Sequence, residues 1–467
     1  MRILSITAGA AGMYCGSCLR DNSLAVELLA RGHDVTLLPL YTPTTTDEPS
    51  VSRNQVLFGG ISVYLQQYLG LFRKTPRFLD RVWDSPRVIK ALASRSLATD
   101  PKLLGDLTIS MLEGERGVLR KEFEKMLEWL AGEPAPDLVN LPNSLLIALA
   151  EPIRHALKSP VCCTLQGEDL FLDGLIEPYR GRALELIRSK VRDVDRFIAV
   201  SEYYAPVMAK LLHIPADRIS VIPLGINMTG YEMTGDEQRH RTAAGDDQAF
   251  RVGYFARVAP EKGLHVLAEA YPRFRRRVDK AAPATRSGAS ETTAGAITNI
   301  RLEAAGYLSR AHMPYLEDVR RSLDTAGLLG EFTYHGAVDR DGKLAFLRSL
   351  DVMSVPAPYD EPKGVFLLEA MASGVPVVQP RRGAFTEIVE KTGGGLLVAP
   401  DDPDALADGL YSLYQDRALA ERLGERGFRG VRQHYDIRRS ADRLLDLYGS
   451  LIAQPAPAAQ DRLAASH

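Results

Sequence analysis

The stretch that decides the fold is Tyr359-Asp-Glu-Pro-Lys-Gly-Val-Phe-Leu-Leu-Glu-Ala-Met-Ala-Ser-Gly-Val-Pro-Val-Val378. The apolar run before it, which ends near Val355, predicts a buried strand. The acidic, proline-bearing segment that follows predicts a loop, and Gly364 leads from this loop into a helix. Residues 375–379 then predict the next strand, so the stretch is one step of an alternating α/β pattern.

The same alternation continues on both sides of this stretch. A first series of strands is expected at 2–7, 34–38, 137–140, 161–165, 196–200 and 219–222, and a second at 250–255, 301–305, 331–334, 351–355, 375–379 and 395–398. Helical patterns separate most of these strands. Two such series predict an α/β fold with two Rossmann-like, doubly wound domains that face each other across a cleft.

Changes in composition along the chain set the expected domain limits. The first domain is expected over 1–226, because Pro223-Leu-Gly225 reads as a hinge, and the second over 227–430. A proline-broken helical pattern at about 42–135 predicts a helical insertion in the first domain. Segment 281–298, rich in Ala, Thr, Ser and Gly, and the Ala- and Pro-rich tail 454–467 are expected to be disordered.

The overall composition excludes several classes of protein. The 467 residues contain 57 Lys+Arg and 59 Asp+Glu, so a net charge of -2 gives no global reason to bind nucleic acid. No apolar run reaches the roughly 18 residues that a membrane helix needs. The N-terminus reads as a first strand rather than a signal peptide. Four cysteines make no disulfide framework, so the cytoplasm is the expected location.

The residues around Gly364 predict a site for a phosphate and a sugar. Gly364 allows close approach of a ligand, and the amides of Val365 and Phe366 at a helix N-terminus can hold a phosphate. Glu361 and Glu369 border that phosphate, and their carboxylates can accept hydrogen bonds from hydroxyl groups. Phosphate and hydroxyl recognition together suit a nucleotide sugar. The alternative is a helix flanked by carboxylates by chance.

The string E-P-x-G followed by E-A-M-A-x-G-x-P-V-V resembles the E-x7-E motif of retaining glycosyltransferases with the two-domain GT-B fold, especially family 4. The segment Gly253-Tyr-Phe-Ala-Arg-Val-Ala-Pro-Glu-Lys-Gly263 resembles the family's G-R-x-x-x-x-K-G segment, with Ala256 in place of the usual Gly. The resemblance implies that Arg257 and Lys262 neutralise the donor diphosphate and that no metal or other cofactor is needed. Surface charge is the alternative role of these two cations.

The resemblance spans about residues 1–450, outside the insertion and the 281–298 loop. It implies that the first domain holds the acceptor and the second the donor. It also implies that a C-terminal helix at 431–453 crosses back onto the first domain. Gly16, at the end of the first glycine-rich loop, is assigned to donor binding.

Gln166 departs from the family pattern. It stands where the family often has a His near the reacting face of the sugar. Gln166 can donate a hydrogen bond but cannot take up a proton near neutral pH. It is therefore a candidate catalytic residue that orients a reactant, and the alternative is that it only shapes its loop.

Two further features allow other interpretations. Cys15-Gly-Ser-Cys18 has metal or redox spacing, and Cys162-Cys163 is expected at the same sheet edge; the alternative is a small-residue loop beside a buried pair. The stretch 71–95 has seven basic and two acidic residues. It could lie on an anionic membrane or hold a charged acceptor, and a solvated helix face is the alternative.

Together these observations predict a retaining, metal-independent glycosyltransferase. It would move a sugar from a nucleotide-diphosphate sugar to a glycan, lipid or small-molecule acceptor. The expected location is the cytoplasm, with peripheral attachment to the inner membrane face as an option. The alternatives are a non-catalytic nucleotide-sugar-binding protein and a thiol redox or metal protein built on Cys15 and Cys18.

Overall fold

The computed structural model describes residues 1–9, 16–44, 46–53, 56–58, 101–232, 249–281 and 299–453. The chain divides into two compact units, which we call unit 1 (Met1–Gly225 with Ile437–His467) and unit 2 (Ile226–Asp436). The basic stretch 71–95, much of the expected insertion, nearly all of the 281–298 loop and the 454–467 tail lie outside the described residues.

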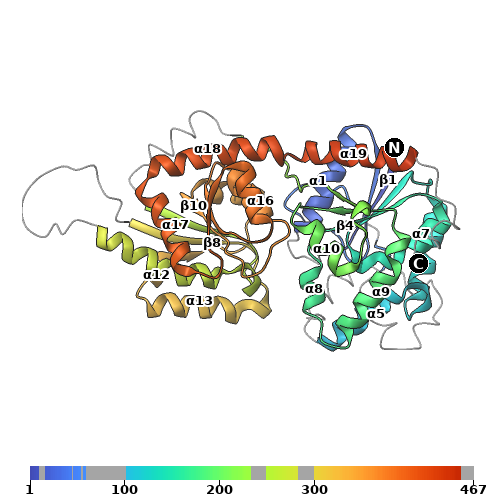
Figure 1. Ribbon diagram of the computed structural model, residues 1–467, viewed down its shortest axis with the longest axis horizontal. Coiled ribbons are helices and arrows are strands. Elements are labelled where there is room, and N and C mark those ends of the chain that lie inside the picture. The colour runs from blue at the N-terminus through green and yellow to red at the C-terminus, as the bar shows by residue number, and fades with distance from the viewer. Residues whose placement is uncertain are drawn as a thin grey trace, which may run out of the picture. The chain divides into compact units, whose positions relative to one another are not determined.

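The core of unit 1 is a six-stranded parallel sheet with the order β2-β1-β3-β4-β5-β6 (Figure 1). Arg2 pairs with Asp34 across β1 and β2, and Ile3 pairs with Leu138 across β1 and β3. The strands are short runs of mostly apolar residues, as expected where helices cover both faces. Their bounds are β1 (Arg2–Thr7), β2 (Asp34–Pro39), β3 (Leu138–Leu141), β4 (Val161–Leu165), β5 (Arg196–Ala199) and β6 (Ile219–Val221).

Helices cover both faces of this sheet, because successive strand residues point to opposite sides. Ile3 packs with α1 and α19 on one face, whereas Leu4 packs with the remaining helices on the other. The helices are α1 (Gly16–Ala30), α5 (Pro101–Glu113), α6 (Arg120–Gly132), α7 (Ala150–Leu157), α8 (Asp169–Asp173), α9 (Tyr179–Lys190), α10 (Tyr204–Leu212) and α19 (Ile437–Ala453), with 3-10 turns η2 (Gly114–Arg116), η3 (Ser144–Leu149), η4 (Val191–Asp193) and η5 (Ala216–Arg218).

Unit 2 repeats this plan with a second six-stranded parallel sheet, in the order β12-β11-β10-β7-β8-β9. Its strands are β7 (Ala249–Phe255), β8 (Asn299–Ala305), β9 (Phe332–Tyr334), β10 (Val352–Met353), β11 (Val377–Pro380) and β12 (Gly395–Val398). The expected α/β class with two doubly wound sheets is confirmed.

The helices of unit 2 follow its strands in alternation. They are α12 (Leu264–Ala281), α13 (Met313–Thr325), α14 (Arg340–Arg348), α15 (Val365–Ala372), α16 (Gly383–Thr392), α17 (Pro403–Gln415) and α18 (Arg417–His434), with 3-10 turns η6 (Pro260–Lys262), η7 (Arg310–His312) and η8 (Leu329–Glu331). None of the described helices has the length and apolar character that a membrane crossing requires.

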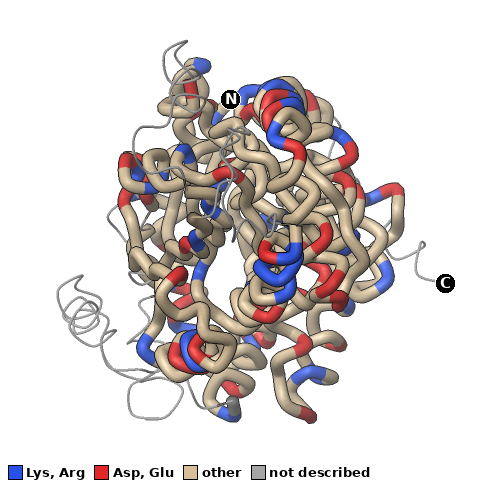
Figure 2. The backbone as a smooth tube through the Cα atoms, turned by 90° about the vertical axis from the view of Figure 1, so that its left-hand side faces the viewer, with Lys and Arg blue, Asp and Glu red and all other residues tan. Residues whose placement is uncertain are grey.

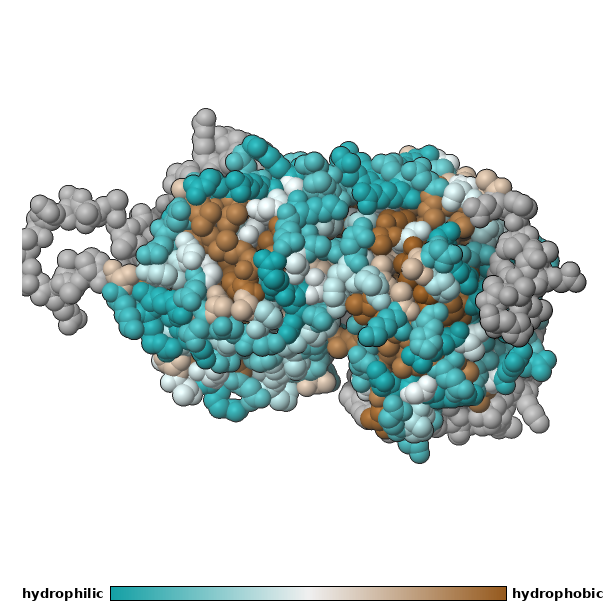
Figure 3. Space-filling view, viewed as in Figure 1, coloured by the Kyte–Doolittle hydropathy of each residue, from teal (hydrophilic) through white to brown (hydrophobic). Residues whose placement is uncertain are grey.

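The surface agrees with the balanced composition. Acidic and basic residues are interspersed along the described backbone (Figure 2). Hydrophilic residues dominate the face shown in Figure 3, with smaller apolar areas between them.

The strand order defines one switch point in each sheet. In unit 1 the chain moves from β1 to β2 and then crosses to β3 on the other side of β1; in unit 2 it runs through β7, β8 and β9 and then crosses to β10. Open α/β sheets bind ligands outside the carboxyl ends of the strands at such points. The loops after β1 and β3, and those after β7 and β10, are therefore the places to look for function.

Candidate functional site

The loops after β7 and β10 are held against each other at the switch point of unit 2. The 3-10 turn η6 ends at Gly263, whose φ is +76°. A Cβ atom at Gly263 would lie 2.1 Å from the carbonyl oxygen of Pro356 in the loop after β10. Only glycine allows this approach. It brings Lys262, at the end of η6, close to the acidic segment that precedes α15.

Lys262, Tyr359 and Glu361 form one cluster there. Lys262 Nζ makes an ion pair with Glu361 Oε2 and donates a hydrogen bond of 2.9 Å to the Tyr359 hydroxyl. The Tyr359 hydroxyl in turn donates to the same Glu361 oxygen. The ammonium also lies 5.2 Å from the centre of the Tyr359 ring and 5.6 Å from that of Phe366. Two aromatic rings and a carboxylate thus position one cation.

Glu361 is ionised in this setting although it is only 2% exposed. Burial by itself raises the pKa of its carboxyl group, but the charges of Lys262 and Lys363 and the hydrogen bonds from Lys262 and Tyr359 lower that pKa to about 2. The buried carboxylate and the Lys262 ammonium therefore depend on each other for compensation.

The N-terminus of α15 lies directly after this cluster. Gly364 caps the helix with φ +62°, in the left-handed region. The amides of Val365 and Phe366 in the first turn have no carbonyl partner within the helix, because helix geometry supplies none. The backbone before them is fixed, since the Ala384 amide donates to the Glu361 carbonyl oxygen at 2.8 Å. This arrangement can hold a phosphate group.

Arg257 lies on the loop after β7 but is less enclosed. Its side chain is 39% exposed and pairs with Glu261 at 2.5 Å. The Tyr254 hydroxyl donates to the Arg257 carbonyl oxygen at 3.0 Å, which fixes the backbone rather than the guanidinium. The structure thus brings Lys262 and Glu361 into direct contact and leaves Arg257 as an outer cation on the same loop.

Glu369 has partners that the sequence analysis missed. It is 4% exposed, and its Oε1 atom accepts a 2.6 Å bond from Lys343 Nζ, which is 1% exposed. The Tyr231 hydroxyl lies 3.5 Å from the same oxygen. Lys343 stands among the buried residues Leu344, Phe346 and Leu347 of α14. A lysine in such an apolar context was the one available signal of a buried pair.

At the edge of unit 1, Gln166 and Glu168 join the loops after β3 and β4. Gln166 is 4% exposed, and its Nε2 atom donates to the Pro142 carbonyl oxygen at 2.7 Å. Glu168 accepts the Gln166 amide at 2.8 Å and both the amide and hydroxyl of Ser144 at 3.0 and 2.9 Å. Burial raises the pKa of Glu168, and these neutral donors oppose that shift.

The other unit 1 residues singled out in the sequence, Gly16 and the cysteines, lie only partly within the described residues. Gly16 is the first residue of α1, and the loop before it, residues 10–15, lies outside the described residues together with Cys15. Cys18, Cys162 and Cys163 are buried and form no disulfide within the described part of the chain. Burial raises the pKa of the Cys162 and Cys163 thiols, which disfavours the reactive thiolate.

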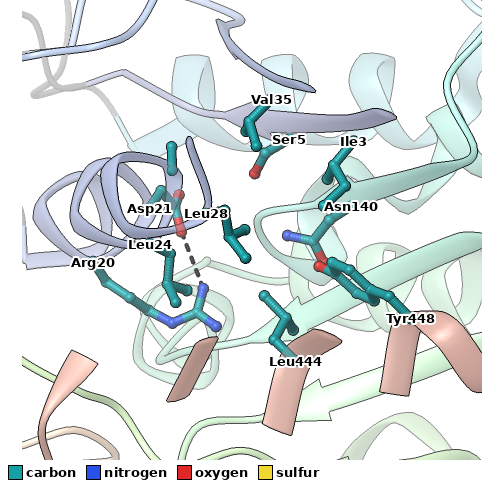
Figure 4. Close-up of a pocket in the computed structure, with 11 residues that line it drawn as sticks. Ile3, Ser5, Arg20, Asp21, Leu24, Leu28, Val35, Asn140, Leu444 and Tyr448 are labelled. Carbon is teal, nitrogen blue, oxygen red and sulfur yellow. Dashed lines mark hydrogen bonds and ion pairs between the residues drawn. The ribbon is translucent and has the colours of Figure 1, made fainter. Parts of the chain in front are cut away.

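No group of His, Cys, Asp or Glu side chains suited to a metal ion occurs among the residues that the structure describes. A small cavity does lie between α1, α19 and the sheet of unit 1 (Figure 4). Arg20 pairs there with Asp21 at 3.1 Å, near Asn140 and Tyr448. Its volume of about 20 Å³ has room for a water molecule and none for a sugar.

Comparison with known proteins shows which families and solved structures the chain resembles. Residues 109–229 match the family described as Glycosyltransferase Family 4, and residues 236–429 match Glycosyl transferases group 1. The solved structure of sucrose-phosphate synthase from Thermosynechococcus elongatus has a TM-score of 0.68 and 17% identity, covering 97% of this chain and 100% of that chain.

Two curated relatives cover different shares of the chain. An uncharacterised glycosyltransferase of Methanocaldococcus jannaschii is 24% identical over 71% of this chain and 79% of its own length. A GDP-mannose-dependent alpha-(1-6)-phosphatidylinositol monomannoside mannosyltransferase of Mycobacterium tuberculosis is 29% identical over 46% of this chain and 51% of its own length. The two family matches together span more than half of the chain, and both sheets have the expected topology. The chain therefore belongs to the family 4-like glycosyltransferases with the GT-B fold.

Proposed function

We propose that this glycosyltransferase moves a sugar from a nucleotide-diphosphate sugar to an acceptor hydroxyl with retention of the anomeric configuration. The observation that carries the proposal is the half-buried Lys262–Tyr359–Glu361 cluster beside the α15 N-terminus. A fixed ammonium and free helix amides form a site for a diphosphate, and the adjacent ionised carboxylate suits sugar hydroxyls.

In this proposal the protein stabilises the leaving group by charge. The diphosphate lies against the amides of Val365 and Phe366, with Lys262 and Arg257 as the cations that neutralise the charge developing on its oxygen. These groups take the place of a metal ion, so the reaction needs none. The departing phosphate oxygen accepts the proton of the attacking hydroxyl on the same face, so no protein nucleophile is required.

The names of the relatives suggest which donors and acceptors to test first. The mycobacterial relative is named as GDP-mannose-dependent and as acting on a phosphatidylinositol mannoside. GDP-mannose is therefore the first donor to test, with UDP-glucose beside it. Glycans, lipids and small polyols are the acceptor classes, and a lipid acceptor would give the basic stretch 71–95 a role at a membrane surface.

A thermal-shift panel of nucleotide sugars in the presence of EDTA tests the donor half of the proposal. A donor at about 100 times its Kd adds about 2.7 kcal/mol of stability, which is easily detected. NMR of the product's anomeric proton tests the mechanism: an α-linked donor should yield an α-linked product. An inverted product, or turnover that EDTA abolishes and Mg²⁺ restores, would contradict the proposal.

A further inference from the structure

A small cavity in unit 1 is lined by polar side chains from four elements of the fold. It lies between α1, α19 and the sheet and has a volume of about 20 Å³. Ser5 comes from β1, Arg20 and Asp21 from α1, Asn140 from β3 and Tyr448 from α19. Figure 4 shows the Ser5 hydroxyl, the Asn140 amide and the Arg20 guanidinium directed toward the same space. Polar groups that converge in an otherwise apolar core need hydrogen-bond partners.

Arg20 makes fewer hydrogen bonds than its buried position requires. Its side chain is 4% exposed, and a guanidinium carries five N–H groups. One of them donates to Asp21 Oδ1 at 3.1 Å, and no other described group accepts from this side chain. Neighbouring positions of a helix point in different directions, so the pair is a single bond rather than a bidentate one. The remaining N–H groups of Arg20 therefore require a further acceptor.

Asn140 and Tyr448 present further polar atoms to the cavity. Asn140 is 5% exposed, and its Oδ1 atom accepts a hydrogen bond of 3.1 Å from the Thr164 hydroxyl. The other end of the amide, the Nδ2 atom with two N–H groups, points into the cavity (Figure 4). Tyr448 is 2% exposed, and its hydroxyl bonds to no described group. Burial raises the pKa of Tyr448, so the hydroxyl stays protonated and can both donate and accept.

The charge and the size of the cavity select its ligand. The charges of Arg20 and Asp21 balance and the other polar groups are neutral, so a neutral ligand fits better than an ion. One water molecule needs about 10–15 Å³, whereas a sugar or a phosphate group needs far more than the volume of about 20 Å³. The ligand must also accept from N–H groups and donate to a carboxylate or a hydroxyl. Water has both capacities.

We propose that this cavity is a hydration site, in which an ordered water molecule accepts hydrogen bonds from Arg20 and Asn140 and donates one to the Tyr448 hydroxyl. The water joins α19 to α1 and to the sheet at a point where the surrounding contacts are apolar, among them Leu28 and Leu444. Buried waters of this kind are part of a structure and are costly to remove. The role concerns the stability of unit 1 and does not depend on the proposed function.

Filling the cavity tests the site through the sign of the change in stability. Ser5→Val replaces the hydroxyl with two methyl groups on β1, where a branched side chain is favoured. It would raise Tm if the cavity were dry, because it would fill a void. In a hydration site it displaces the water and leaves N–H groups of Arg20 and Asn140 unpaired, so Tm should fall by about 4 °C. Ser5→Ala is the matched control, since it leaves room for the water and should change Tm little.

A second background separates displacement of the water from simple overpacking. In the double variant Arg20→Met with Asp21→Asn, the cavity loses its main donor and both charges, so Ser5→Val should no longer lower Tm. The same loss of Tm in both backgrounds would mean that valine is merely too large, and it would overturn the inference. A rise in Tm for Ser5→Val in the parent would overturn it as well.

Crystals of the full chain test the ligand directly. Density for one water molecule within hydrogen-bond distance of Arg20 and Asn140 is expected in the parent and should be missing in Ser5→Val. Crystals soaked in bromide or pressurised with xenon should show neither atom in the cavity. Bound bromide would make this an anion site and bound xenon a dry one, and either result overturns the inference.

Hydrogen exchange tests the link to α19. Tyr448→Phe keeps the ring and removes only the hydroxyl, so the amides of α19 should exchange about 10-fold faster, while those of α7 exchange as in the parent. Equal exchange rates of α19 in the parent and in Tyr448→Phe would show that the water does not join α19 to the sheet, against the proposal.

Discussion

The switch points of the two units share a topology but differ in chemistry, and two buried carboxylates show the difference. Glu361 in unit 2 is compensated by the Lys262 ammonium, and its pKa is lowered to about 2. Glu168 in unit 1 is held by neutral donors from Ser144 and Gln166, and burial raises its pKa. The buried carboxylate of unit 2 is therefore compensated by a charge and that of unit 1 by neutral hydrogen-bond donors, although both lie at the edge of a parallel sheet.

Separating Lys262 from Glu361 should have the largest effect. Lys262→Met removes the proposed leaving-group cation and should lower kcat about 100-fold or more. It also leaves Glu361 buried and unpaired, which should reduce the free energy of unfolding by about 3–5 kcal/mol. Steady-state kinetics and urea unfolding measure the two effects.

The double variant Lys262→Met with Glu361→Gln is the matched control. It removes both charges and should recover most of the stability while activity stays low. Arg257→Ala should lower turnover without a comparable loss of stability, because the Arg257 side chain is exposed. A folded Lys262→Met variant with parental turnover would refute the role of this cation.

The second buried pair of unit 2 is expected to act through stability and donor affinity. Glu369→Ala leaves the Lys343 ammonium buried without its carboxylate, at a cost of about 3–5 kcal/mol. If Glu369 also contacts donor hydroxyls, the Kd for the nucleotide sugar should rise. The Kd for the nucleotide without the sugar should rise equally only if Glu369 contacts the ribose. Replacing the pair by Lys343→Met with Glu369→Gln separates the two roles, since stability should recover and affinity should not.

The pH dependence of stability should differ in sign between the two carboxylates. The pKa of Glu361 is depressed from 4.5 to about 2, so its contribution is present above pH 4.5 and is lost as the pH falls toward 2. The pKa of Glu168 is raised above 4.5, so the folded state gains stability from its protonated form below pH 4.5 and loses it as the pH rises through the folded value.

Urea unfolding as a function of pH in the parent, Glu361→Gln and Glu168→Gln checks this contrast. In the Glu361→Gln variant, the free energy of unfolding should decline less than in the parent as the pH falls from 4.5 to 2. In the Glu168→Gln variant, the free energy of unfolding should decline less than in the parent as the pH rises above 4.5. Identical pH profiles of the free energy of unfolding for the two variants would contradict the proposed electrostatic difference between the two carboxylates.

Gln166 should give the smallest effect. Gln166→Ala removes one hydrogen-bonding side chain and no charge, so turnover should fall about 10-fold rather than disappear. Gln166→His restores the residue common in the family and should be at least as active as Gln166→Ala. Comparison of kcat and KM for both variants measures this, and complete inactivity at normal donor affinity would show that Gln166 performs an essential step.

Short-range patterns in the sequence were sufficient to predict the architecture. The alternating apolar runs predicted both sheets, because strand and helix formation depend on neighbouring residues and on their hydrophobic period. The segment from Glu361 to Glu369 predicted the helix N-terminus at Gly364 and the residues around it, because capping and turn formation are also local. The assignment of Lys262 and Arg257 to a donor site came from the motif resemblance, and that of the two glutamates came from the residues around Gly364; both assignments stay predictions.

Only the tertiary structure decided which side chains meet. Lys343 and Tyr231 lie 26 and 138 residues from Glu369 in the sequence, and no local rule connects them. The partner of Gln166 is also a tertiary feature: the sequence analysis expected its side chain to donate a hydrogen bond to a reactant, whereas its Nε2 atom donates to the carbonyl oxygen of Pro142. Local preferences determine the elements, but the partners of a buried polar atom depend on how distant segments pack around it.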